Sequence, residues 1–130
     1  MRVLGELVLR VDDLDRMKVF YRDVVGLDVY HDEPPYVFMK IADAADGHPQ
    51  LLGLFDRPKA EPSEAKIMDH FAFLIDLEDY EREERRLHDL GVGTTRRELP
   101  YFGWRALFFL DPEGNVVELV CYDESLKERG

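Results

Sequence analysis

Hydrophobic and polar positions alternate in two separate parts of the chain, at residues 4–11 and again at residues 68–75. In the first part, two leucines and Val11 fall on one side of an extended segment, whereas Glu6, Val8 and Arg10 fall on the other. Such alternation predicts half-buried strands, with an apolar side against a core and a mixed side that faces a cavity. His70 stands in the second segment where Glu6 stands in the first.

A helical pattern follows each of these strands. Residues 14–25 carry apolar side chains at helical spacing behind a pair of aspartates, one of which we expect to cap the helix, and Gly26 ends it. Residues 78–90 repeat this arrangement, with a run of charges that we assign to the solvent side, and Gly91 ends the second helix. The two halves of the chain therefore begin alike.

Three short strands are expected after each helix. They are predicted at about 28–32, 36–41 and 50–56 in the first half, and at 94–98, 104–110 and 116–122 in the second. The common order of elements indicates two βαβββ modules within one domain.

The modules have predicted boundaries along the 130 residues. Module 1 covers about 2–56, and residues 57–67, which contain prolines and several charges, form a linker. Module 2 covers about 68–122, and residues 123–130 are expected to be a frayed tail. The whole chain is thus expected to be a single domain made of two packed halves.

Composition limits the possible functions. With 45% hydrophobic and 12% aromatic residues, the chain is long enough to bury a core. It has no apolar run of the length of a signal peptide core or a membrane span, so we expect a cytoplasmic protein. A net charge of −11 argues against nucleic acid and acidic membrane surfaces as partners. The single cysteine, Cys121, is expected to be a packed, inert thiol.

Four polar residues stand out within otherwise apolar strands. Each module has one at the start of its first strand, Glu6 or His70, and one on its last strand, Gln50 or Glu118. Burying a carboxylate, imidazole or amide without a partner is costly. A divalent ion would satisfy all four, so the duplicated pattern suggests a metal site.

The second half also contains a turn with a specific sequence. Asp111-Pro112-Glu113-Gly114-Asn115, followed by Glu118-Leu119, and the two duplicated modules resemble the vicinal oxygen chelate superfamily over residues 2–122. This superfamily includes glyoxalase I, methylmalonyl-CoA epimerase, extradiol dioxygenases, fosfomycin-resistance enzymes and bleomycin-resistance proteins. The resemblance implies an α+β fold in which two βαβββ modules form curved mixed sheets around a concave cleft. It indicates a fold more than a reaction.

The resemblance also implies a ligand set. Glu6, Gln50, His70 and Glu118 would point into the concave face and hold the ion, with Glu6 and Glu118 as the catalytic candidates. Such an oxygen-rich set suits Mn(II), Fe(II), Co(II), Ni(II) or Mg(II) better than a closed structural zinc site. An open coordination position would bind a substrate through one or two oxygens, and the ion would stabilise an enolate or activate dioxygen.

The leading functional prediction is a small metal-dependent enzyme, either a lyase or isomerase or a dioxygenase, that acts on a small oxygenated molecule. Arg10 would orient a substrate carboxylate or carbonyl, and Trp104, Phe108 and Tyr122 would line the pocket. Ring-cleaving relatives typically have a second histidine where this chain has Glu6 and a tyrosine where it has Phe108, which argues against a dioxygenase. A glutathione or coenzyme A substrate would call for a basic surface, for which only Arg96-Arg97 and Arg105 are candidates.

Several alternatives stay open at this point. Glu6 could pair with Arg105 instead of a metal, His70 could be a hydrogen-bonded cavity histidine, and Gln50 could have no ligand role. The aromatic residues could belong to the core. The competing function is a metal-free protein of the bleomycin-resistance type, which sequesters an aromatic, often cationic, ligand. Because two modules leave sheet edges exposed, we expect a homodimer, with each site within one chain or shared by two.

Overall fold

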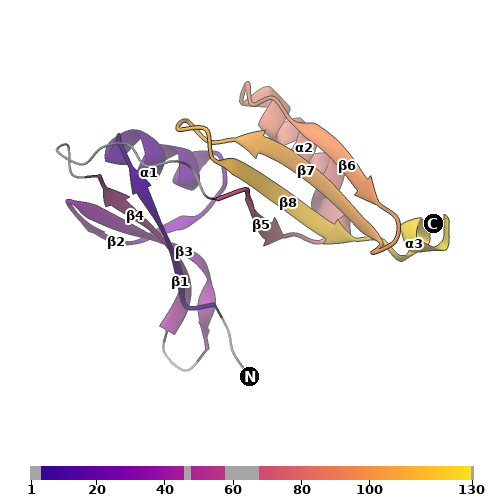
Figure 1. Cartoon of the computed structure of the whole chain (residues 1–130), viewed down its shortest axis with the longest axis horizontal. Helices are drawn as coiled ribbons and strands as arrows, with labels where there is room; N and C mark the ends of the chain where they lie inside the picture. Colours follow the sequence, from indigo (N-terminus) through magenta and orange to yellow (C-terminus); the bar gives the residue numbers. More distant parts are fainter. Residues whose placement is uncertain (1–3, 46–47, 58–67, 130) are drawn as a thin grey trace. The chain divides into compact units, whose positions relative to one another are not determined.

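A computed structural model describes residues 4–45, 48–57 and 68–129 of the chain. The chain divides into two compact units, Met1–Ala65 and Lys66–Gly130, and each is described below by itself (Figure 1). Each unit contains a four-stranded mixed sheet.

The described residues of unit 1 form one helix and four strands. They are β1 (Glu6–Val11), α1 (Leu14–Asp23), β2 (Asp28–Glu33), β3 (Tyr36–Ala45) and β4 (His48–Asp56). The strand order is β1-β4-β3-β2, with β1 parallel to β4 and the other neighbours antiparallel. Asp13 caps α1 by accepting a hydrogen bond from the backbone N–H of Arg16, and Gly26, with φ of 90°, follows the helix.

Unit 2 repeats the arrangement of unit 1. Its elements are β5 (Phe71–Leu74), the short 3-10 helix η1 (Leu77–Asp79), α2 (Tyr80–Asp89), β6 (Thr95–Leu99), β7 (Trp104–Leu110), β8 (Val116–Tyr122) and α3 (Glu124–Arg129). The strand order is β5-β8-β7-β6, again with one parallel pair, β5 and β8, and two antiparallel pairs. The predicted α+β fold with two βαβββ modules is confirmed.

Two details differ from the sequence-based prediction. Strand β3 extends to residue 45 and β4 begins at residue 48, so both are longer than the strands predicted at 36–41 and 50–56. The frayed tail is also wrong, because residues 124–129 form α3 and Leu126 is buried. Asp123 explains this order, since its carboxylate accepts hydrogen bonds from the backbone N–H and the hydroxyl of Ser125 at the start of the helix. Most of the predicted linker, residues 58–67, lies outside the described residues.

Each sheet has one face covered by its helix, here called the helix face, and an opposite open face. In β1, Leu9 and Val11 are buried on the helix face, whereas Val8 and Arg10 are exposed on the open face. The fully buried side chains of unit 1 include Met17, Tyr21, Met39, Leu52 and Leu54. In unit 2, Cys121 is buried on the helix face, where burial raises the pKa of its thiol, in agreement with an inert role.

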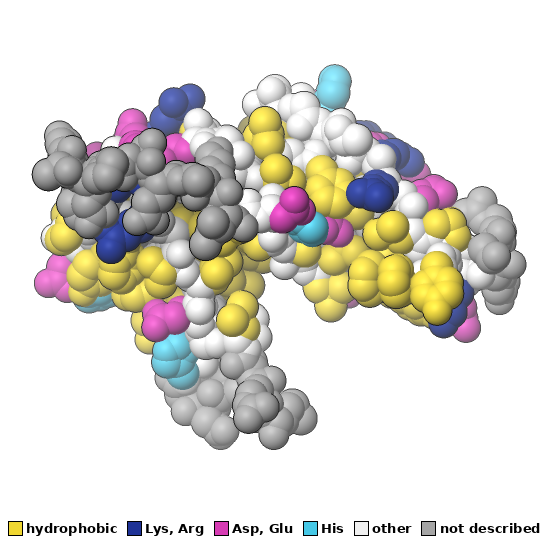
Figure 2. All heavy atoms as spheres, in the orientation of Figure 1, with side chains coloured by type: hydrophobic (Ala, Val, Ile, Leu, Met, Phe, Trp, Pro, Cys, Tyr) yellow, Lys and Arg dark blue, Asp and Glu magenta, His cyan; other side chains and the backbone are white. Residues whose placement is uncertain are grey.

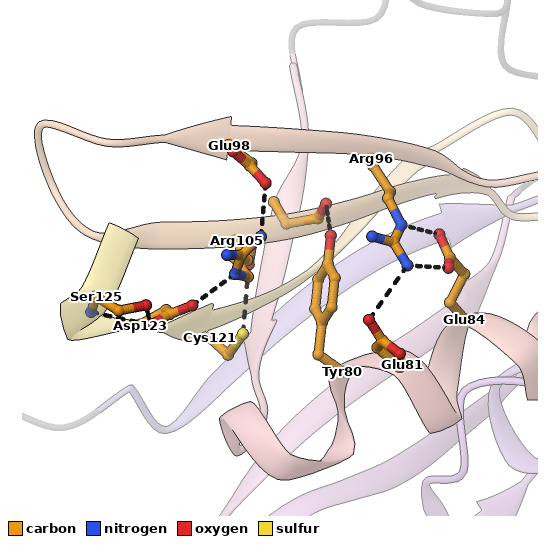
Figure 3. A network of polar contacts seen from close by, with 10 residues as sticks. Tyr80, Glu81, Glu84, Arg96, Glu98, Arg105, Cys121, Asp123 and Ser125 are labelled. Atoms are coloured by element: carbon orange, nitrogen blue, oxygen red, sulfur yellow. Dashed lines mark hydrogen bonds and ion pairs between the residues drawn. The ribbon is translucent and has the colours of Figure 1, made fainter. Parts of the chain in front are cut away.

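A network of polar contacts ties the helix face of unit 2 together (Figure 3). Arg105 donates to Asp123 over 2.7 Å and to Glu98 over 2.6 Å. Arg96 binds Glu84 of α2, and the Tyr80 hydroxyl donates to the backbone carbonyl of Ala106 over 2.9 Å. Hydrogen bonds from Ser125 and Arg105 lower the pKa of Asp123 to about 2. Through its contact with Arg96, Glu84 connects α2 to β6, whereas we expected the charges of residues 78–90 to face solvent.

The open face of unit 1 is packed closely around Gly53. A Cβ atom at this position would lie 3.1 Å from Val8, 3.1 Å from Phe38 and 3.2 Å from Phe55. The Phe55 ring also stacks on Tyr36, with 5.3 Å between the ring centroids. Apolar and aromatic side chains thus occupy the space above this glycine.

The Asp123 network predicts a pH-dependent stability. The ordinary pKa of this carboxyl is 3.8 and its folded value is about 2, so it stabilises the fold above about pH 4, and the contribution is lost as the pH falls toward 2. Asp123→Asn should lower the free energy of unfolding at neutral pH, and the difference from wild type should shrink in acid. Urea denaturation across this range measures it, with exposed Asp89→Asn as the charge-matched control. A difference that stays constant in acid would contradict the assignment.

The packing around Gly53 predicts that a methyl group is not tolerated there. Gly53→Ala should lower the free energy of unfolding by about 1–3 kcal/mol, because three side chains crowd the new Cβ from different directions. Gly93→Ala is the control, since nothing lies within 4 Å of a Cβ at that position. It should be neutral or slightly stabilising. Equal unfolding free energies for the two variants would contradict the prediction, because the three side chains around Gly53 would then move aside at no cost.

Candidate metal site

The open face of unit 2 can be defined from its strand register. Leu107, Leu119 and Cys121 are buried on the helix face, so the alternate residues of β7 and β8 lie on the open face. Four rows of register partners lie on this face. The rows are Ala72-Glu118-Phe108-Thr95, Leu74-Val120-Ala106-Arg97, Tyr122-Trp104-Leu99 and Val116-Leu110.

Glu118 and His70 meet on this face. Glu118 lies in the inner strand β8 and is 6% exposed, with Ala72 and Phe108 as its register partners. His70 directly precedes β5, and its Nε2 atom lies 3.1 Å from Oε1 of Glu118. The structure therefore brings together the two ligands that the sequence predicted in module 2. Figure 2 shows acidic and histidine side chains side by side at the surface, among hydrophobic ones.

Two further contacts hold the imidazole ring of His70. Its Nδ1 atom lies 2.6 Å from Oδ2 of Asp69. The Phe108 ring meets it edge to face, with 5.7 Å between the ring centroids. Both ring nitrogens thus face carboxylate oxygens, and one side of the ring rests against an aromatic surface.

The His70 and Glu118 pair fits one edge of an octahedral metal site. Two donors that lie about 2.1 Å from one ion at a right angle are about 3.0 Å apart, whereas a tetrahedral angle would separate them by about 3.4 Å. The observed 3.1 Å is close to the octahedral value. Within residues 4–45, 48–57 and 68–129, no group of three or more histidine, cysteine, aspartate or glutamate side chains is arranged to hold an ion. The pair accounts for two ligands only.

Glu6 and Gln50, the predicted ligands of module 1, differ in their placement. Glu6 is exposed on the open face of unit 1, on the same side of β1 as Arg10. Its register partner in β4 is Leu51, and because neighbouring residues in a strand point to opposite faces, Gln50 faces away from Glu6. Ligand roles for both residues stay predictions.

The internal repeat gives a different counterpart for Glu118. Val8 follows Glu6 by two positions as Ala72 follows His70, and Ala72 pairs with Glu118 whereas Val8 pairs with Gly53. Unit 1 thus has a glycine where unit 2 has the carboxylate. This correspondence of Gly53 with Glu118 follows from the parallel strand pairs β1–β4 and β5–β8. The sequence-based prediction instead uses the nearest polar residue of the last strand, which is Gln50.

The basic residues of unit 2 are divided between the two faces. Arg105, which the sequence made a candidate partner of Glu6, binds Glu98 and Asp123 on the helix face, and Arg96 is held there by Glu84. Arg97 lies between them in sequence and is exposed on the open face, level with Ala106. Sequence reasoning did not separate these arginines, although strand alternation places Arg96 and Arg97 on opposite faces.

The predicted pocket aromatics are not part of the core. Trp104 and Tyr122 are register partners on the open face, with exposed fractions of 41% and 50%. Phe102 stacks on Trp104, with 4.6 Å between ring centroids, and Tyr101 meets Phe102 edge to face. Phe108 is half-buried beside Glu118. These rings are available to a ligand on the same face as the His70 and Glu118 pair.

Comparison with known proteins identifies the family. The sequence model of the Glyoxalase/Bleomycin resistance protein/Dioxygenase superfamily matches residues 3–119, and the protein belongs to this superfamily. It is 25% identical over 116 residues to glutathione transferase FosA of Serratia marcescens, a match that spans 89% of this chain and 78% of that protein.

Solved structures agree with this placement. Lactoylglutathione lyase from Agrobacterium tumefaciens is 27% identical, with a TM-score of 0.70 over 92% of each chain. Fosfomycin resistance protein FosX from Mesorhizobium loti is 24% identical, with a TM-score of 0.67 over 99% of this chain and 98% of that one. An integron cassette protein from the Halifax Harbour sewage outfall has a TM-score of 0.75 at 19% identity, over 93% and 99%. The last two show the fold alone.

None of the helices within residues 4–45, 48–57 and 68–129 has the length and apolar character needed to cross a bilayer.

Proposed function

We propose that this protein is a small metal-dependent enzyme of the superfamily, in which His70 and Glu118 bind a divalent ion and a small oxygenated substrate binds beside them. The observation that carries the proposal is the 3.1 Å approach of His70 Nε2 to a buried Glu118 carboxylate on a mostly apolar sheet face. One nitrogen and one carboxylate oxygen suit Mn(II), Fe(II), Co(II), Ni(II) or Mg(II).

The residues around the pair suggest how a substrate would be held. A bound divalent ion supplies Lewis-acid stabilisation of negative charge on a substrate oxygen. Arg97 lies one row away from Glu118 on the same face and would neutralise an anionic group of the substrate. Trp104 and Tyr122 supply apolar surface for the rest of the molecule. Arg10 keeps its predicted role toward a carboxylate or carbonyl.

The names of the relatives support one class of reaction. A lactoylglutathione lyase and a glutathione transferase are 27% and 25% identical to this chain. The side chain next to Glu118 in β7 is Phe108, which lacks the hydroxyl group of the tyrosine expected in ring-cleaving enzymes. We therefore propose a lyase, isomerase or transferase reaction in preference to oxidative ring cleavage.

A second candidate function rests on the exposed aromatic side chains. Tyr101, Phe102, Trp104 and Tyr122 are 83%, 48%, 41% and 50% exposed, and the net charge of the chain is −11. These features would also suit a protein that sequesters an aromatic cation without a metal. In that case His70 and Glu118 would form an ion pair.

The homodimer also remains part of the proposal. Strands β1 and β2 are the edges of one sheet, and β5 and β6 are the edges of the other. Edge strands with unpaired backbone groups are often covered by a second copy of the chain.

Metal titration separates the two functions. Isothermal titration with Mn(II) should show about one ion per chain, and saturation to 100 times the dissociation constant should stabilise the fold by about 2.7 kcal/mol. Glu118→Gln, which keeps the size of the side chain but removes its charge, should abolish both effects, as should His70→Ala. Exposed Glu78→Gln is the control and should bind like wild type. If wild type binds no Mn(II), Co(II) or Ni(II), the metal-free function is favoured.

The same titration tests the predicted ligands of module 1. Glu6→Gln should weaken Mn(II) binding if the carboxylate is a ligand, since it removes a negative charge. Gln50→Ala should weaken binding only if the amide oxygen contributes. A variant that keeps wild-type affinity removes its residue from the ligand set and leaves His70 and Glu118 unaffected.

A further inference from the structure

The imidazole ring of His70 lies between two carboxylates. Its Nδ1 atom is 2.6 Å from Oδ2 of Asp69, and its Nε2 atom is 3.1 Å from Oε1 of Glu118. The two contacts differ in burial, because the Asp69 side chain is 96% exposed and that of Glu118 is 8% exposed. Asp69 has no place in the predicted ligand set.

The two contacts compete for the single proton of a neutral imidazole. An ionised carboxylate can only accept a hydrogen bond, and the contact of Nδ1 with Asp69 is the shorter one and has hydrogen-bond geometry, so it favours the proton on Nδ1. In a neutral imidazole the other nitrogen, Nε2, then has a free lone pair. This atom is the one directed toward Glu118, so the tautomer selected by Asp69 is the one that a metal at this pair requires.

We propose that Asp69 is a positioning residue for the metal site. It holds His70 in the Nδ1–H tautomer and orients the ring, so that Nε2 and Oε1 of Glu118 converge on one ion. This inference rests on the proposed function. Hydrogen bonds from the second nitrogen of a metal-binding histidine to a carboxylate commonly raise its basicity and fix its orientation.

A stabilising role for Asp69 in the fold is a poor alternative. Ion pairs between exposed side chains contribute little to stability, and this carboxylate is almost fully exposed. The ring also has a second support, since Phe108 meets it edge to face at 5.7 Å. Removing Asp69 should therefore free the rotation and tautomer of His70 without unfolding the unit.

The test is Mn(II) affinity of the full chain, measured by isothermal titration for wild type, Asp69→Ala and Asp69→Asn. Asp69→Ala should weaken binding about tenfold, a typical effect of losing such a partner. Asp69→Asn should recover most of the affinity, because its amide oxygen still accepts the Nδ1–H bond. Asp89→Asn, an exposed change of the same charge at the end of α2, should bind like wild type. Melting temperatures without metal should be equal for all four proteins.

Each other result has a distinct meaning. Wild-type affinity in Asp69→Ala would overturn the positioning role and leave the proposed function in place. Equal losses in Asp69→Asn and Asp69→Ala would also overturn it, since the effect would then be one of charge and not of the hydrogen bond. Absence of Mn(II) binding by wild type would overturn both the proposed function and this inference.

Discussion

The structure of unit 2 depends on the burial of one carboxylate. Glu118 lies in an inner strand between Ala72 and Phe108 and is 6% exposed, and an isolated charge in such a place is strongly unfavourable. The Nε2 atom of His70 lies 3.1 Å from Oε1 of Glu118 and is the nearest polar contact of this carboxylate among the described residues. The same pairing of β5 with β8 that builds the sheet brings the histidine to the carboxylate. Folding and the candidate chemistry therefore depend on the same strand register.

The arginine side chains on the two faces of the unit 2 sheet have different surroundings. On the helix face, Arg105 and Arg96 are engaged by acidic partners and connect β6 and β7 to α2 and α3. On the open face, Arg97 is an exposed cation that lies two strands and one row away from Glu118. A protein with a net charge of −11 thus has a cation on the same sheet face as the His70 and Glu118 pair.

The sequence predicted the duplicated fold because its signals are local. An alternating strand followed by a helix and a glycine recurs in both halves, and the strands predicted at 104–110 and 116–122 have the observed bounds of β7 and β8. Glu118 and His70 could be predicted as neighbours because a buried carboxylate in an apolar strand requires a partner. The repeat made His70 the equivalent of Glu6 and so identified that partner.

Features that depend on register could not be read from polarity alone. We predicted Gln50 as a ligand because it is polar. In the structure, Leu51 is the register partner of Glu6, and Gly53 occupies the position in unit 1 that Glu118 occupies in unit 2. The order of the C-terminal segment was missed because it depends on hydrogen bonds between Asp123 and both Ser125 and Arg105. The contact of Asp69 with His70 was missed for the same reason, since it depends on the conformation of two adjacent side chains.

Anomalous diffraction from a crystal grown with saturating Co(II) shows directly whether His70 and Glu118 bind one ion. We expect one strong anomalous peak within bonding distance, about 2.0–2.3 Å, of both His70 Nε2 and Glu118 Oε1. The same map would identify the remaining ligands. An ordered His70 and Glu118 in direct contact, with no anomalous peak beside them, would show that the pair is not a metal site.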